Sequence, residues 1–246
     1  MKALKRSLLA LAVFVGAAGL SVAVQPPQGG RGQGGGGGPA ALVRSKTVIA
    51  DVKITEEQQG KLKDWSKEFG AKAQEMMKEG MDGIDRQDRK AWAEKMPAIQ
   101  AKVSAAAYTE LATVLKPEQV TRLKQIEVQV AGLRAFNQPD VKAALKVTDD
   151  QEAKIKDATD TAMKDGRDLA EEYGVKGFGG RPDDADKAKE FDKKRAAITK
   201  ETMTKVMGTM SDDQKKAWAK LTGAPIDVTK VQADMAAGFQ RKPKDV

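Results

Sequence analysis

A five-residue phrase occurs four times in this chain, and each copy has the pattern of a helix start. An aliphatic residue or Met is followed by an N-cap position, then by two residues that are acidic or Pro, and then by Gln. Ser or Thr at an N-cap accepts a hydrogen bond from the backbone N–H three residues on, and Gln at that position bonds back to the N-cap N–H. The capping residues of the four copies are Ile54, Thr55 and Gln58; Leu115, Pro117 and Gln119; Val147, Thr148 and Gln151; Met210, Ser211 and Gln214.

The second copy departs from this pattern. Lys116 takes the N-cap position and is a poor cap, whereas Pro117 fits the first helical position, where its missing N–H costs nothing. The likeness among the copies continues beyond the cap, since mostly apolar residues recur eight and eleven residues after each start. A spacing of three keeps two side chains on one helix face. These residues, expected to face inward, are Leu62 and Trp65, Leu123 and Ile126, Ile155 and Ala158, and Trp218 and Leu221.

The spacing of the copies indicates an internal duplication. The first and third copies lie 93 residues apart and the second and fourth lie 95 apart, so two motifs form one repeating unit. We therefore predict an all-α fold of two tandem units, each with a long amphipathic helix hairpin. The predicted divisions are a signal peptide (1–23), a Gly/Pro-rich disordered linker (24–46), unit one (47–132), unit two (133–225) and a C-terminal tail (226–246).

Apolar residues recur at helical spacing in both hairpins. The first hairpin is predicted to pair 55–78 with 85–114, with Trp92 facing inward and a kink or short break at Pro97. The second is predicted to pair 148–173 with 183–208. A weak helix is expected over 228–239, and the acidic cluster near Asp183 is expected to start a helix rather than to bind a cation.

Composition excludes several classes of active site. The chain has no cysteine and no histidine, so neither a Ser-His-Asp nor a Cys-His arrangement can form. We expect no enzymatic activity, no cofactor and no metal site. The formal net charge is +8, but 43 basic residues are mixed with 35 acidic ones and no arginine-rich stripe is present. This mixture does not favour nucleic-acid binding.

The N-terminal residues have the pattern of an export signal. Lys2, Lys5 and Arg6 precede an apolar run over 8–20, and small residues at Ser21 and Ala23 offer a cleavage site. The run is short for a membrane span. We expect export through a cleaved signal and no stable membrane insertion afterwards; an uncleaved anchor is the alternative.

The repeated phrase resembles the LTXXQ motif of the Spy/CpxP family of small helical periplasmic proteins, over about residues 47–225. The resemblance implies a periplasmic or secreted protein with a cradle of long, thin helices, commonly a homodimer. It implies partners such as unfolded or partly folded envelope proteins, or the periplasmic domain of a sensor kinase. Because the chain holds two units, an intramolecular pseudo-dimer is an alternative to a homodimer. The zinc-linked relatives rely on His-rich ligand sets, which this sequence lacks.

The sequence also suggests a surface for loose binding of polypeptides. Met is flexible and polarisable, and promiscuous binding surfaces use it heavily. Met and basic residues occur together near both hairpins, although core packing explains the Met residues equally well. The expected function is an ATP-independent, chaperone-like stress-response protein, with a kinase regulator or a structural envelope protein as alternatives. The candidate client-binding residues are Lys72, Met76, Met77, Lys78, Arg86, Arg89, Lys90, Lys193, Lys194, Arg195, Met203 and Met207.

Overall fold

The computed structural model describes residues 38–85, 88–175 and 180–239, and within these ranges the chain is all-α, with no strand. The predicted signal peptide, most of the predicted linker and the last seven residues lie outside the described residues. The helices are α1 Pro39–Leu42, α2 Lys46–Val52, α3 Glu56–Gly80, α4 Arg89–Leu111, α5 Pro117–Ala131, the 3-10 helix η1 Gly132–Asn137, α6 Pro139–Leu145, α7 Asp149–Glu172, α8 Ala185–Gly208, α9 Asp212–Thr222 and α10 Val228–Phe239.

The four repeated phrases begin α3, α5, α7 and α9. Thr55, Thr148 and Ser211 each accept a hydrogen bond from the backbone N–H of the Gln three residues on, and that Gln accepts one from the cap's own N–H. Lys116 has no side-chain acceptor, so α5 has only the second bond, from the Lys116 N–H to Gln119 Oε1 at 2.9 Å. The expected helix starts are therefore confirmed.

A first core lies where the N-terminal helices, the base of the first hairpin and α10 meet. Leu42 and Val48 from α1 and α2 are buried there together with Leu62 from α3, Leu111 from α4 and Leu123 from α5. This core brings residues near the start of the described chain against residues near its end. Both terminal segments are consequently parts of one packed unit.

A second core lies under the other hairpin. Phe136 of η1 stacks on Trp218 of α9, with ring centroids 4.5 Å apart, and Ile155 of α7 and Val206 of α8 pack beside them. Helix α5 contributes to both cores, because Val128 and Ala131 pack in or against the second core while Leu123, Ile126 and Val130 are in the first. The two cores are thus joined through one shared helix.

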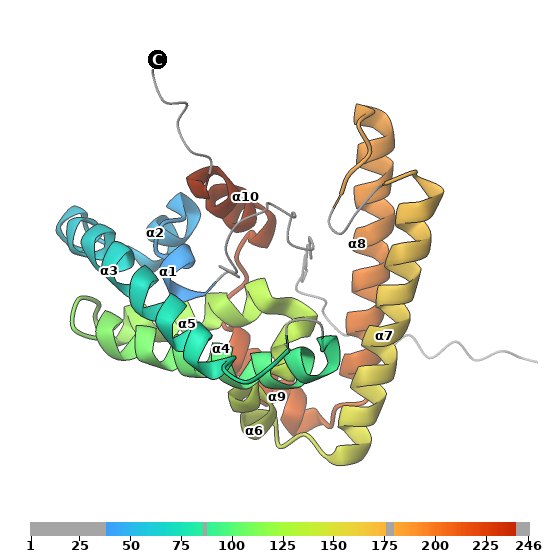
Figure 1. Ribbon diagram of the computed structural model, residues 1–246, viewed down its shortest axis with the longest axis horizontal. Coiled ribbons are helices and arrows are strands. Elements are labelled where there is room, and N and C mark those ends of the chain that lie inside the picture. Colours follow the sequence, from blue (N-terminus) through green and yellow to red (C-terminus); the bar gives the residue numbers. More distant parts are fainter. Residues whose placement is uncertain (1–37, 86–87, 176–179, 240–246) are drawn as a thin grey trace, which may run out of the picture.

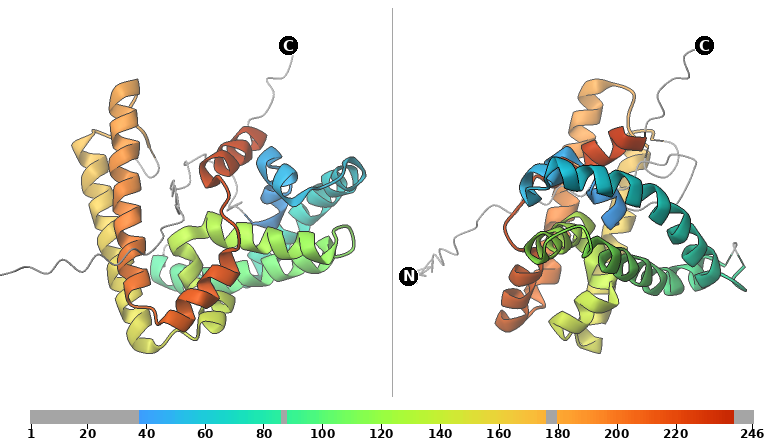
Figure 2. Two further views of the ribbon diagram at one scale, coloured as in Figure 1. Left: turned by 180° about the vertical axis from the view of Figure 1, so that it is seen from behind. Right: turned by 90° about the vertical axis from the view of Figure 1, so that its left-hand side faces the viewer.

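Beyond these cores, the chain forms two helix hairpins. Helices α3 and α4 pack on each other, and so do α7 and α8. The α7–α8 hairpin rises as a separate arm beside the rest of the molecule, steeply inclined to α3 and α4 (Figures 1 and 2). The hairpins offer much helix surface outside the cores. The cradle and the pseudo-dimer stay predictions.

Parts of the predicted linker and of the predicted tail belong to the first core. The predicted disordered linker extends to Lys46, yet Pro39 is buried in α1, and Leu42 and Val43 are buried in the first core, so this end of the linker prediction is wrong. The helix expected over 228–239 within the tail is confirmed as α10, and its Val228 and Val231 are buried in the same core. Helix α10 is fixed further by Asp234, which accepts hydrogen bonds from the Thr47 N–H at 2.8 Å and from Ser45 Oγ at 2.9 Å. Short apolar segments can be core elements when distant parts of the chain supply their partners.

Pro97 does not interrupt its helix. Helix α4 runs through it from Arg89 to Leu111, so the break expected there is absent. A proline inside a helix costs about 3 kcal/mol through a lost hydrogen bond and a steric clash. Ile99, Ala107 and Tyr108 lie in the turns that follow Pro97, and they reach their buried positions because the helix continues. Their burial offsets the cost of the proline.

The duplication extends to backbone details that the motif does not include. Helices α2 and α6 both end at a lysine in the left-handed conformation, Lys53 with φ 56° and Lys146 with φ 50°. This conformation is unfavourable for residues other than Gly, Asn and Asp. The two lysines lie 93 residues apart, which is also the spacing of the first and third motif copies. This agreement supports the short α2 as the counterpart of α6.

Candidate functional site

The motif glutamines do more than cap their own helices, because they also pair across the structure. Gln58 Nε2 donates to Gln119 Oε1 at 2.8 Å, and Gln119 Nε2 donates back to Gln58 Oε1 at 3.1 Å. The remaining side-chain N–H groups donate to backbone carbonyls: that of Gln58 to Val114, and that of Gln119 to Lys53 and Val52. Each amide oxygen also accepts from its own cap N–H. Both amides are therefore fully hydrogen-bonded.

The second unit repeats this arrangement. Gln151 and Gln214 exchange two hydrogen bonds of 2.8 Å. Gln151 Nε2 also donates to the Thr209 carbonyl, and Gln214 Nε2 donates to the carbonyls of Leu145 and Lys146. The phrase therefore fixes two helix starts and a neighbouring chain segment to one another. The pair was not anticipated, because capping explained each glutamine on its own.

The α3 part of the predicted client surface is accessible. Met76 and Met77 are half-buried, and Lys78 and Lys90 are exposed. Arg86 lies outside the described residues, and only the backbone of Arg89 is described. Lys72, in contrast, contributes to a structural network. Its ammonium contacts Glu110 Oε1 at 2.6 Å, and the other oxygen of that carboxylate accepts from Trp65 Nε1 at 2.9 Å.

The α8 part of the predicted surface does not form as expected. Met203 is buried in the second core, and Met207 packs against that core. The last turns of α8 lie against α7 and contribute to the second core, so their Met side chains fill space in the protein interior. Arg195 is half-buried, with its guanidinium 5.7 Å from the centre of the Phe191 ring. Of the predicted α8 residues, Lys193 and Lys194 remain accessible.

An apolar surface lies instead at the tip of the first hairpin. A Cβ at Gly80 would lie 2.7 Å from Ile99 Cγ1, so the last residue of α3 packs closely on α4, and α4 extends beyond it to Arg89. We call the side chains near this end the hairpin-tip surface. Trp92, expected to face inward, is 40% exposed because α4 reaches beyond the packed part of α3. The surface comprises Met77, Met81, Ile84, Trp92 and Met96, which are half-buried apart from the more exposed Trp92.

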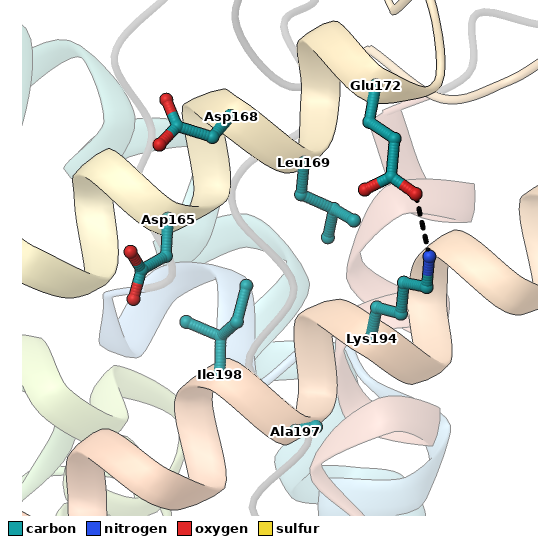
Figure 3. Close-up of a pocket in the computed structure, with 7 residues that line it drawn as sticks. All are labelled: Asp165, Asp168, Leu169, Glu172, Lys194, Ala197 and Ile198. Carbon is teal, nitrogen blue, oxygen red and sulfur yellow. Dashed lines mark hydrogen bonds and ion pairs between the residues drawn. The ribbon is translucent and has the colours of Figure 1, made fainter.

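The α7–α8 hairpin carries a shallow groove of about 420 Å³. Leu169 and Ile198 point into the space between the helices and form its floor with Ala197 (Figure 3). Lys194 contacts Glu172 at 2.8 Å, and its ammonium lies 4.9 Å from the centre of the Tyr173 ring. These contacts raise the pKa of Lys194. The remaining lining residues are Asp165 and Asp168.

The groove is acidic, which differs from the basic surface expected on this hairpin. The carboxylates of Asp165 and Asp168 project from α7 in different directions, both at the end of the groove away from Lys194 (Figure 3). Among the described residues, neither carboxylate lies within 4 Å of a basic nitrogen. The groove therefore has one end neutralised by an ion pair and one end with two carboxylates that form no ion pair, although Lys205 interacts electrostatically with Asp165.

A partly buried carboxylate lies at the junction of α4, α5 and α6. Glu127 on α5 accepts hydrogen bonds from Tyr108 Oη at 2.8 Å and from Ser104 Oγ at 3.1 Å, both on α4. Burial raises its pKa to about 6, although these two bonds favour the ionised form; Asp140 on α6 adds to the rise and Lys124 opposes it. Burial and Glu127 likewise raise the pKa of Tyr108.

The raised pKa of Glu127 predicts a specific pH dependence of stability. Between its ordinary value of 4.5 and about 6, the folded protein binds more protons than the unfolded chain. The contribution of Glu127 to stability is therefore full below pH 4.5 and falls by about 2 kcal/mol as pH rises past 6. Glu127→Gln should remove this loss, as measured by urea unfolding between pH 4 and 8.

Glu110→Gln is the control for that experiment, because the ion pair with Lys72 lowers the pKa of Glu110 and gives the opposite slope. The stability contribution of Glu110 is present above its unfolded pKa and is lost as pH falls. An unchanged pH profile in Glu127→Gln would contradict the assignment of the buried carboxyl.

In the described part of the chain, acidic side chains form no group of three that could hold a metal ion. None of the helices in that part has the length and apolar character needed to cross a membrane. Searches against family models, curated proteins and solved structures found no significant match to this chain.

Proposed function

We propose that this protein is an exported, chaperone-like binding protein that holds unfolded polypeptides without ATP. The observation that carries the proposal is the hairpin-tip surface, where Met, Ile and Trp side chains are accessible beside lysines. Flexible thioethers and an exposed indole contact many apolar sequences without requiring one shape. Lys78 and Lys90 attract acidic segments over a longer range.

The position of this surface supports the proposal. It lies beyond the two cores, so a bound polypeptide need not disturb the packing that holds the fold. Gly80 and Ile99 keep the two helices close just below it. Export to the periplasm rests on the signal pattern of residues 1–23, and the repeated phrases resemble the LTXXQ motif of a family that includes such chaperones.

The proposal predicts that the purified protein suppresses light scattering by two unrelated denatured proteins, less well at high salt. Trp92→Gln should require about fivefold more protein for the same suppression, because an aromatic contact is worth about 1 kcal/mol. Met163→Gln is the matched control: Met163 is 57% exposed on α7, away from the tip.

Equal suppression by Trp92→Gln and Met163→Gln would show that the clients bind at a surface other than the hairpin-tip surface. If a well-folded sample at severalfold excess suppresses the aggregation of neither client, the chaperone proposal is ruled out. A folded partner such as a sensor-kinase domain would then be sought in envelope extracts, and fractionation with the envelope alone would favour a structural role.

A further inference from the structure

We propose that the α7–α8 groove binds a cationic amphipathic peptide segment, in which Lys or Arg lies within a helical turn of a Leu-sized side chain. This inference goes beyond the proposed function, because it concerns a different hairpin with the opposite charge. It rests on an apolar floor beside two carboxylates, Asp165 and Asp168, that form no ion pair within 4 Å.

The floor determines the apolar part of the occupant. Leu169 and Ile198 face each other across the groove; Leu169 is buried, whereas Ile198 is half-buried and Ala197 is exposed, so these last two form the part of the floor that a side chain from outside can contact. A single Leu-sized side chain could cover these residues. Burying such a side chain is favourable in proportion to the apolar area removed from water.

The edge determines the charge of the occupant. Asp165 and Asp168 are three residues apart on α7 and therefore neighbours on the helix surface. Lys205 lies close enough to Asp165 to interact electrostatically, but its ammonium pairs with Glu201 at 2.9 Å. Lys194 is likewise engaged with Glu172. Two carboxylates are thus left for positive charges of a partner, which complementarity of charge favours.

The test is fluorescence anisotropy of a labelled 12-residue peptide of Leu and Lys with helical amphipathic spacing. Asp165→Asn/Asp168→Asn should weaken binding about fivefold, given that each exposed charge pair contributes modestly. Glu68→Gln/Glu75→Gln on α3 is the matched control, since it removes two exposed charges elsewhere and should change binding less than twofold. Ala197→Phe should fill the floor and weaken binding at least as much as the aspartate variant.

A peptide with Glu in place of Lys, and one with Gly in place of Leu, should both bind much more weakly. Equal loss in the two charge variants would show that the peptide responds only to net charge and would overturn the proposal, as would unchanged binding by a folded Ala197→Phe variant. Trp92→Gln should leave peptide binding intact. This separates failure of the groove from failure of the hairpin-tip surface.

Discussion

Replacing Gln119 with Glu should lower the free energy of unfolding by about 3 kcal/mol at pH 7.5, although the two side chains have nearly the same shape. Gln119 is 7% exposed, and its Nε2 donates to Gln58 Oε1 and to the carbonyls of Val52 and Lys53. A carboxylate cannot donate, so an anion would face three acceptor oxygens. Urea unfolding followed by circular dichroism measures the loss.

The loss should shrink at low pH. The surrounding acceptors raise the pKa of the introduced carboxyl in the folded state, so the protonated form can again donate one hydrogen bond. The penalty is full above that raised pKa and declines as pH falls towards the unfolded value. Gln74→Glu on the exposed face of α3 is the control and should change stability by less than about 0.5 kcal/mol.

If Gln58 and Gln119 act as a unit, the losses in the free energy of unfolding caused by substituting each of them will not be additive. Gln58→Ala/Gln119→Ala should cost less than the sum of the two single variants, because either substitution alone leaves the other amide unpaired. Additive losses would show that the glutamines cap their helices independently. Gln214→Glu should repeat the Gln119 result in the second unit, where the equivalent bonds exist.

Val231→Asp should destabilise the protein by more than about 4 kcal/mol, as expected for an unpaired charge placed in a core. Val231 is 0% exposed and packs in the first core with residues from α1, α2 and α5. The loss of the Val231 side chain from this core should release α10 and expose the N-terminal helices α1 and α2 to solvent. Thermal unfolding by circular dichroism measures the effect.

Ala236→Asp is the control for this variant, because it places the same charge on an exposed position of the same helix. Tryptophan fluorescence adds a test of where the damage lies. Trp65 packs against the first core and Trp218 against Phe136 in the second, so single-Trp versions report on each core. A Val231→Asp protein as stable as its control would show that α10 is dispensable.

Local capping chemistry made the helix starts predictable. Thr55, Thr148 and Ser211 each make bonds to a residue three positions on, so the required partners lie within the phrase itself. The inward faces were equally predictable, since Leu62, Leu123 and Ile155 are all buried. Helical period alone requires residues at these spacings to share a face.

The candidate binding surfaces were predicted only in part. Met76 and Met77 are accessible, but Met203 fills the second core. A Met on an amphipathic helix has the same local pattern in both situations, and only the neighbours of that helix decide between them. The exposed Trp92 and the acidic groove were missed for the same reason.

The sequence by itself determined the elements of this protein: an all-α chain, its main helix starts, the buried face of each motif helix and the register of its duplication. These properties depend on hydrogen bonds and periodicities within a few residues. The tertiary structure alone decided which segments meet. It placed α1 and α10 in one core, paired Gln58 with Gln119 across 61 positions, and let α4 continue through Pro97. Such contacts depend on the partner surface that each helix finds, and no local pattern encodes that partner.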